Sequence, residues 1–365
     1  MVRDSLQGAA ALGRAADVAA LLAAGADVNQ ANEEGATPLF IASANGHAEV
    51  VTKLLAANAS VDRAENNGVT PLYIACEQGH AEIVTKLLAA NATVDQADND
   101  GVTPLSTACE RGHTEVVTIM LAANANANQA DNRGITALIV ACQHGQDEVV
   151  ANLLDANAAV EQADNEGTPM FHACENGHLG CVQLLSSYGA SRTFAFDDPE
   201  SDTAEHIAMS RNYTILYNGL IISRHWTPLH HFEVLTPERA RALMRAGASA
   251  NAGDPSPLDR AKELCSSGRF GPGSAAHVVL EWGAPWKRTT HKFYPPAVRA
   301  RVAVLMRIAQ AIKRGKAAYE ADGVFVAFAN PAAAADVFES CVIPHLISSE
   351  VWDGGEKKDV EVAGE

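Results

Sequence analysis

The chain has 365 residues, 47% of them hydrophobic, which is enough for one long solenoid or two ordinary domains. Its formal net charge of −17 is concentrated in residues 1–200, which hold 8 Lys and Arg against 26 Asp and Glu. Such an acidic arm argues against a nucleic-acid ligand, because it would repel phosphates. It is compatible with a protein partner of basic or neutral surface, although solubility explains the same charge equally well.

The start of the chain, residues 1–34, reads as an incomplete repeat. The stretch LGRAADVAALLAAGADVNQ contains a helix with a Leu-Leu pair, a glycine stop at Gly25 and a polar loop. It lacks the TPLxxA motif that opens the later copies. Because the terminal units of a repeat array must present one face to water, we expect residues 1–34 to form an N-terminal capping repeat.

A segment then repeats at constant spacing with small changes. Each copy opens with a glycine, at Gly35, Gly68, Gly101, Gly134 and Gly167, and continues with TPLFIA, TPLYIA, TPLSTA, TALIVA or TPMFHA. Self-similarity at a fixed period is the signature of a solenoid, in which each copy buries its apolar stripe against its neighbours.

The chemistry of one copy predicts two short helices and a loop. Thr37 before Pro38 suits a helix start, because the hydroxyl can cap free amides and proline has no N–H to leave unsatisfied. Gly46 would end the first helix, and a second helix from about Ala48 to Ala57 would end at Asn58. Asn58 and its equivalents Asn91, Asn124, Asn157, Gly189 and Gly247 are residue types that tolerate a left-handed conformation. The polar segment that follows each second helix would turn back as an extended finger.

The period and the TPLxxA motifs resemble those of the ankyrin-repeat family. The resemblance implies an all-α ankyrin solenoid, with a helix-turn-helix and a hairpin-like finger in each repeat. It also implies that ligands bind a concave surface made of finger tips and the exposed ends of the first helices. The matching positions in this chain are Glu33, Glu34, Asn45, Asn66, Asn67, Glu77, Gln78, Asn99, Asp100, Glu110, Arg111, Asn132, Arg133, Gln143, His144, Asn165, Glu166, Glu175 and Asn176.

These candidate binding residues have a simpler alternative explanation. All of them are polar, as solvent-facing positions would be in any case. The argument for function is geometric, because repetition places a row of such side chains on one extended surface. Their acidic and amide bias favours a partner that presents Lys, Arg or backbone groups.

Regularity decays after the fifth full copy. Residues 35–200 hold five regular repeats, and residues 201–286 hold degenerate ones. TAEHIA at Thr203 is followed by TPLHHF already at Thr227, which is less than one full period later, so the finger between them must be missing or collapsed. SPLDRA at Ser256 opens the last copy.

Beyond Trp286 the chain no longer resembles a repeat. Residues 287–349 predict a helical C-terminal cap, with one helix over 297–314 and another that starts at Asn330 and Pro331. Residues 350–365 predict a disordered acidic tail. The segment 286–316 carries nine Lys and Arg and no acidic residue. It is either a basic patch for acidic partners or a solvated helix face that docks on the acidic arm, and we favour the second.

The last predicted helix suggests an alternative function. AADVFESCVIPHLI is loosely similar to the first helix of the SOCS box, which follows ankyrin repeats in some ubiquitin-ligase substrate adaptors. The departures are Val337 at a leucine position, His345 at a hydrophobic position and Pro344 inside the helix. The ordinary alternative is an apolar helix that caps the solenoid, and we favour it.

Cysteines and histidines recur in phase, without the spacing of a catalytic or metal site. Cys76, Cys109, Cys142 and Cys174 would lie one repeat apart, beyond disulfide reach, and are expected to be buried thiols in a reducing compartment. His47, His80, His113 and His178 would likewise be too far apart to share a metal, so we expect them to be structural turn residues. The cluster of His225, His230 and His231 is more consistent with structure than with zinc.

The sequence therefore predicts a non-catalytic interaction scaffold or adaptor. No nucleophile elbow, phosphate-binding loop or metalloprotease motif is present, so we expect no enzyme activity, cofactor or metal. No apolar run is long enough to span a membrane and the start of the chain lacks a signal-peptide pattern, so we expect no membrane contact. We also expect the protein to be a monomer and to be located in the cytoplasm or nucleus.

Overall fold

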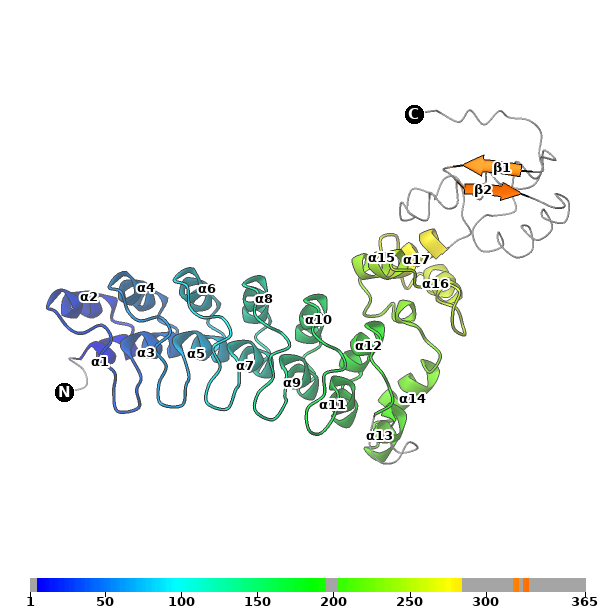
Figure 1. Ribbon diagram of the computed structural model, residues 1–365. Helices are drawn as coiled ribbons and strands as arrows, with labels where there is room; N and C mark the ends of the chain where they lie inside the picture. Colours follow the sequence, from blue (N-terminus) through cyan, green and yellow to red (C-terminus); the bar gives the residue numbers. More distant parts are fainter. Residues whose placement is uncertain (1–4, 195–202, 284–317, 322–323, 328–365) are drawn as a thin grey trace. The chain divides into compact units, whose positions relative to one another are not determined.

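The computed structural model describes residues 5–194, 203–283, 318–321 and 324–327. The chain divides into two compact units, Met1–Val234 and Leu235–Glu365. In the first unit the helices follow one another in pairs (Figure 1). They are α1 (Leu6–Ala11) and α2 (Ala15–Ala23), α3 (Pro38–Ala44) and α4 (Ala48–Ala56), α5 (Pro71–Glu77) and α6 (Ala81–Ala89), α7 (Pro104–Arg111) and α8 (Thr114–Ala122), α9 (Ala137–Gln143) and α10 (Asp147–Asp155), α11 (Pro169–Glu175) and α12 (Leu179–Ser187), and α13 (Ala204–Ser210) and α14 (Thr214–Ile222).

Each first helix from α3 to α11 begins as the sequence predicts. A threonine hydroxyl accepts a hydrogen bond from the backbone N–H three residues later, as in Phe40 N to Thr37 Oγ1 at 3.2 Å. Proline occupies the next position in all of these helices except α9, where it is Ala137. These caps satisfy amides that a helix cannot satisfy itself, which is why such short helices can form here.

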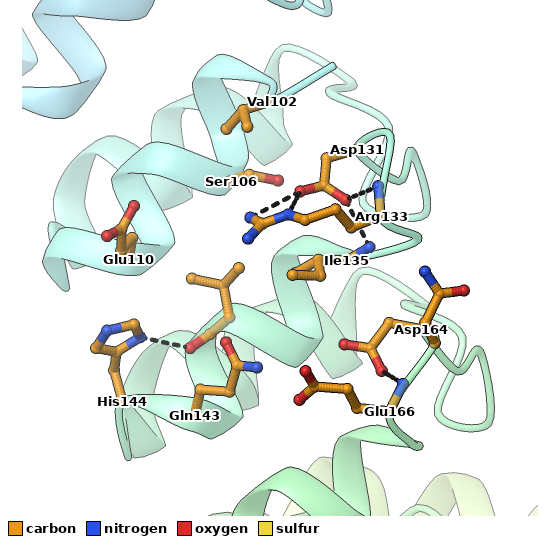
Figure 2. A pocket seen from close by; sticks show the side chains of 12 residues that line it. Val102, Ser106, Glu110, Asp131, Arg133, Ile135, Gln143, His144, Asp164 and Glu166 are labelled. Atoms are coloured by element: carbon orange, nitrogen blue, oxygen red, sulfur yellow. Dashed lines mark hydrogen bonds and ion pairs between the residues drawn. The ribbon is translucent and has the colours of Figure 1, made fainter. Parts of the chain in front are cut away.

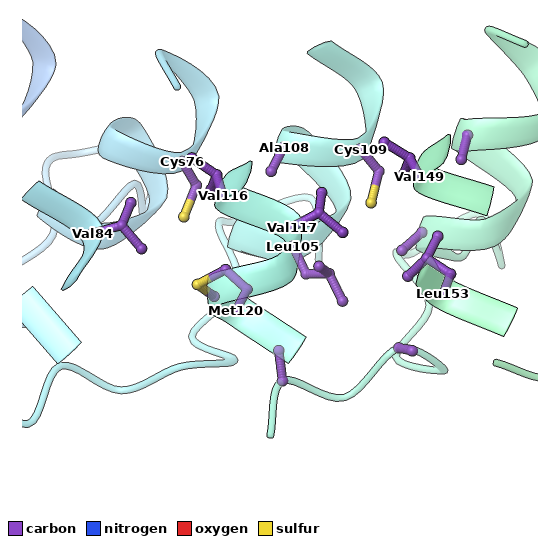
Figure 3. Close-up of a cluster of buried hydrophobic side chains, with 14 of the residues drawn as sticks. Cys76, Val84, Leu105, Ala108, Cys109, Val116, Val117, Met120, Val149 and Leu153 are labelled. Carbon is purple, nitrogen blue, oxygen red and sulfur yellow. The ribbon is translucent and has the colours of Figure 1, made fainter. Parts of the chain in front are cut away.

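The first helices and the second helices form two separate rows (Figure 1). Between the rows lies a continuous core, in which Val50, Val51 and Leu54 of α4 are at most 1% exposed. Figure 3 shows the same arrangement further along, where Leu105 and Cys109 of α7 and Val117 and Met120 of α8 are buried in one cluster. Because each stripe is covered partly by the next repeat, the core belongs to the array and not to any one copy.

The predicted left-handed positions are confirmed. Asn58, Asn91, Asn124 and Asn157 have φ between 61° and 64°. Gly25 and Gly189, at equivalent places, have φ of 86°. The short asparagine side chain makes this conformation accessible where other L-residues would be strained.

The phased histidines join consecutive repeats. Nε2 of His47, His80 and His113 lies 3.0–3.3 Å from the backbone oxygens of Ala11, Ala44 and Glu77, respectively. His178 makes the same contact with the oxygen of Gln143 at 3.1 Å. Each ring therefore satisfies a carbonyl near the end of a preceding first helix, as expected of structural turn residues.

The phased cysteines are free and buried. Burial raises the pKa of the Cys174 thiol to about 12, and it also raises the pKa values of the Cys76 and Cys109 thiols. A thiol with a raised pKa is a poor nucleophile, because the thiolate is the reactive form. These cysteines therefore act as small core residues, as the sequence predicts.

The first unit ends irregularly. As the sequence predicts, no full finger follows α14, and the chain passes directly to a 3-10 turn, η2 (Pro228–His230). His230 closes this turn, since its Nδ1 accepts a hydrogen bond from the backbone N–H of Thr227 at 2.7 Å. His230 and His231 are buried, and the described residues contain no group of three potential metal ligands.

The second unit contains α15 (Pro237–Arg245), α16 (Pro257–Ser266), α17 (Ala275–Gly283) and a two-stranded antiparallel sheet. Strands β1 (Ala318–Ala321) and β2 (Val324–Ala327) pair in a register that sets Ala321 opposite Val324. We did not predict this hairpin within the expected helical cap. The signals were a Val-Phe-Val run and an Asp-Gly pair in the sequence between the strands, a pair typical of two-residue hairpin turns.

The other C-terminal predictions lie outside the described residues. They are the helix over 297–314, the helix that starts at Asn330 with its loose SOCS-box similarity, and the disordered tail over 350–365. In the part of the chain that the structure describes, no helix is both long and apolar enough to cross a membrane.

Candidate functional site

The candidate binding residues lie on the fingers and at the ends of the first helices. All are exposed except Glu77, Gln143 and Glu175, which are half-buried. Within this set the structure separates side chains that hold the array together from side chains that remain available.

Three of the asparagines are used between fingers. The side-chain amides of Asn66, Asn99 and Asn132 donate to backbone oxygens at the equivalent position of the preceding finger, at 3.2–3.3 Å. Their backbone amides also bond to the preceding finger, as in Asn99 N to Asn67 O at 2.9 Å. These residues therefore tie each finger to the next one.

Other candidates cap the first helices. The side-chain amides of Asn45 and Asn176 donate to the oxygens of Ile41 and His172 at 2.8 Å and 2.9 Å. Nδ1 of His144 lies 2.9 Å from the oxygen of Val140. Each of these side chains satisfies a carbonyl in the last turn of its own helix.

Both predicted arginines and two of the predicted glutamates form ion pairs. Arg111 Nη2 lies 3.0 Å from Glu77 Oε1 of the preceding repeat, and Arg211 pairs in the same way with Glu175 of the repeat that precedes it. Arg133 bonds to Asp131 in its own finger, with Nε and Nη2 each 3.1 Å from Oδ2. Exposed pairs of this kind contribute little stability, roughly 0–1 kcal/mol each, but they neutralise the charge.

Five carboxylates on this face remain unpaired. Within the described ranges no ion pair involves the side chains of Glu33, Glu34, Asp100, Glu110 and Glu166. These are the side chains of the predicted set that are available to a basic partner.

Six of the predicted residues meet at a pocket of about 350 Å³ (Figure 2). The pocket lies over α7 and α9 and is closed by the fingers that precede α9 and α11. Its lining consists of Val102, Ser106, Glu110, Asp131, Arg133, Ile135, Val140, Gln143, His144, Asp164, Asn165 and Glu166. The predicted residues among them are Glu110, Arg133, Gln143, His144, Asn165 and Glu166, and the other thirteen candidates do not line it.

A buried acid–histidine pair supports one wall of the pocket. The side chains of His172 and Asp164 are 1% and 3% exposed, and His172 Nε2 lies 3.1 Å from both carboxylate oxygens. Asp164 Oδ1 also accepts hydrogen bonds from the backbone amides of Glu166 and Gly167, both at 2.8 Å. Burial would raise the pKa of Asp164, but the amides of Gly167 and Glu166 and the His172 ring hold it below its usual range. The carboxylate is therefore ionised at neutral pH.

Neither residue of this pair was predicted from the sequence. His172 follows Phe171 in TPMFHA, at a position that holds Ile41, Ile74, Thr107 and Val140 in the other repeats. This histidine, at a position that otherwise holds isoleucine, valine or threonine, is the feature by which the sequence could have revealed the pair. Asp164 is not distinctive in the sequence, because an acidic residue also stands three positions before the finger glycine in the three earlier copies, as Glu65, Asp98 and Asp131.

The histidine behind the pocket is fully engaged by its neighbours. Both ring nitrogens of His172 are engaged, Nε2 by Asp164 and Nδ1 by Gln143 Nε2 at 3.3 Å, so neither is placed to activate a nucleophile. What the pocket offers is a set of hydrogen-bond acceptors and negative charge above an apolar wall.

The sequence model described as "Ankyrin repeats (3 copies)" matches residues 6–98 and 86–164 of this chain. Residues 6–164 are ankyrin repeats. The match spans the solenoid from α1 to the finger that closes the pocket, so the candidate site lies on ankyrin repeats and their immediate continuation. Ankyrin repeats are in general non-catalytic modules of protein–protein interaction.

A solved structure has the same fold. The human ASB11 ankyrin repeat domain aligns with a TM-score of 0.52 and 29% sequence identity, over 58% of this chain and 96% of that one. Among curated proteins, none matches the chain significantly.

Proposed function

We propose that this protein is a non-catalytic scaffold or adaptor that binds a protein partner of basic or neutral surface. The binding surface is the row of finger tips and first-helix ends, which we call the finger face. The observation that carries the proposal is the pocket on this face, which is lined by two exposed carboxylates without ion pairs in the described residues, Glu110 and Glu166.

The distribution of satisfied and unsatisfied charge supports this choice of surface. Two acidic side chains of the finger face pair with an arginine of the next repeat, Glu77 with Arg111 and Glu175 with Arg211. Glu110 and Glu166 have no such partner in the described residues, although they lie close enough to line one pocket. Complementary charge on a partner would relieve their repulsion and favour encounter.

The buried free cysteines support a reducing location for the protein. We therefore propose that the protein and its partner meet in the cytoplasm or the nucleus.

The test is quantitative affinity capture with the full chain and a face variant, Asp100→Lys/Glu110→Lys/Glu166→Lys. Glu77 is left out because its pairing with Arg111 would confound the result. We expect the variant to lose its partners, with affinities reduced about tenfold or more, because like charges would then face each other.

The control reverses three exposed glutamates on the second helices, Glu49→Lys/Glu115→Lys/Glu148→Lys, which changes the charge equally away from the finger face. Of these, Glu49 forms an ion pair, with Lys53 of its own helix, so its reversal removes no ion pair between repeats. Partners retained by this control and lost by the face variant, with unchanged helical circular dichroism in both, would support the proposal. Equal retention by the two variants would contradict it.

A further inference from the structure

We infer that the pocket between α7, α9 and the two adjoining fingers receives a single arginine side chain from an extended segment of the partner. The inference rests on the proposed function and specifies the chemistry that the finger face recognises. Its basis is which acceptors the pocket leaves free and how they are held.

Charge within the pocket is negative and only partly compensated. Its lining contains four carboxylates and one guanidinium. Arg133 is bound to Asp131 through two hydrogen bonds, and Asp164 is bound to His172 and two backbone amides. Glu110, at the end of α7, and Glu166, in the finger before α11, are exposed and remain as the free anions on opposite sides of the opening (Figure 2).

The buried pair also fixes the orientation of the Gln143 amide. An ionised carboxylate only accepts hydrogen bonds, so the His172 Nε2 facing Asp164 must carry the proton. Nδ1, on the other side of the ring, lies 3.3 Å from Nε2 of Gln143, so the NH₂ of this amide faces the ring. The oxygen of Gln143 is consequently left as a further acceptor in the pocket lining.

A guanidinium group matches this set of acceptors. It carries five N–H donors in a planar fork and no acceptor, so it can bond to two carboxylates and an amide oxygen together. The half-buried side chains of Val102, Ile135 and Val140 supply apolar wall for the methylene stem. An ammonium group is a compact, strongly hydrated charge with three donors, so lysine would match the site less well.

Other occupants fit less well. A phosphorylated or acidic side chain would meet four carboxylates against a single, already paired arginine. A purely apolar side chain would remove water from Glu110 and Glu166 without replacing their hydrogen bonds, which is unfavourable.

The experiment is selection of random short peptides displayed on phage against the immobilised full chain, followed by fluorescence-polarisation titration of the selected peptides. We expect the selected sequences to share an arginine, and replacement of that arginine by lysine to weaken binding about tenfold. The pocket variant Glu110→Gln/Glu166→Gln should weaken binding about tenfold or more.

The matched control is Glu33→Gln/Glu34→Gln, the same change at two exposed, unpaired glutamates of the first finger. We expect it to change affinity less than about twofold, since these residues lie outside the pocket. Circular dichroism of all variants verifies folding.

The outcomes separate this inference from the proposed function. If selected peptides lose affinity on the Asp100→Lys/Glu110→Lys/Glu166→Lys variant but tolerate arginine-to-alanine replacement, the partner binds the finger face without an arginine anchor. Equal weakening by the pocket and control variants would likewise overturn the inference. If no peptide is selected, or if the triple variant binds the selected peptides unchanged, the inference fails, whereas the proposed function is decided by affinity capture with the face variant and its control.

Discussion

Single residues decide where negative charge on the finger face is stabilised and where it is left free. Asp164 is held ionised by two backbone amides and His172, whereas Glu110 and Glu166 form no ion pair in the part of the chain that the structure describes. The first arrangement contributes to folding, and the second leaves acceptors for a ligand. Carboxylates that line the same pocket therefore play opposite roles.

The buried Asp164 predicts an acid-dependent part of the stability. Its folded pKa is lowered, so its stabilising contribution is present above the unfolded pKa of about 3.9 and is lost as pH falls through the folded value. We expect Asp164→Asn to cost roughly 1–3 kcal/mol in unfolding free energy at neutral pH, because hydrogen bonds to an ionised group are weakened. The gap from the unmodified protein should shrink below about pH 4.

Urea denaturation from pH 7 to pH 3 measures this gap. Asp100→Asn, at an exposed finger tip, is the control and should show little difference at any pH. A gap for Asp164→Asn that stays constant or widens on acidification would show that the carboxylate is not stabilised by its partners.

At the scale of elements, the fingers are held by close backbone approach at their opening glycines. Gly68 has φ of 86°, and a Cβ there would lie 2.8 Å from the backbone nitrogen of Asn99 and 2.7 Å from its Oδ1. Gly189, at the end of α12, has the same φ, but nothing lies within 4 Å of the corresponding position. Both positions require left-handed backbone, but only Gly68 also lies in close contact with the next finger. Substitutions at the two glycines therefore distinguish the cost of backbone strain from the cost of that contact.

Alanine substitution at these glycines should reveal the difference. Gly189→Ala should lose about 1–2 kcal/mol through left-handed strain alone. Gly68→Ala should lose that amount and roughly 1–3 kcal/mol more, because the next finger must shift to make room. Equal losses in chemical denaturation of the two variants would show that the fingers are not packed against one another at this point.

At the scale of the whole molecule, the candidate site belongs entirely to the first unit. Every residue that lines the pocket lies between Val102 and Glu166, and the first unit extends from Met1 to Val234. Because a solenoid is stabilised by contacts between neighbouring repeats, loss of distant repeats should leave the pocket unchanged.

A chain that ends at Val234 should therefore fold and bind. We expect it to retain helical circular dichroism and to bind the selected peptides with affinities within about twofold of the full chain. Weaker binding with intact helicity would show that Leu235–Glu365 contributes to recognition. Loss of helicity would show that the first unit depends on the second for folding.

The sequence alone determined the repeat architecture of this protein. Period, threonine caps and left-handed asparagines are local properties that recur in each copy. The starts of the first helices, the ends of the second helices and the row of candidate residues could therefore be predicted from them. The collapsed finger before Thr227 was also visible, because a full repeat cannot fit between Thr203 and Thr227.

Only the tertiary structure decided which of those candidates are free to bind. Asn99 and Asp100 are neighbours in one finger, but the first is used by the preceding finger and the second has no ion pair in the described residues. Glu77 and Glu110 occupy equivalent positions, and they differ because the repeat after Glu77 supplies Arg111. The contact between His172, Asp164 and Gln143 likewise joins two repeats. Pairings of this kind depend on the stacking of different copies, which a pattern within one copy does not contain.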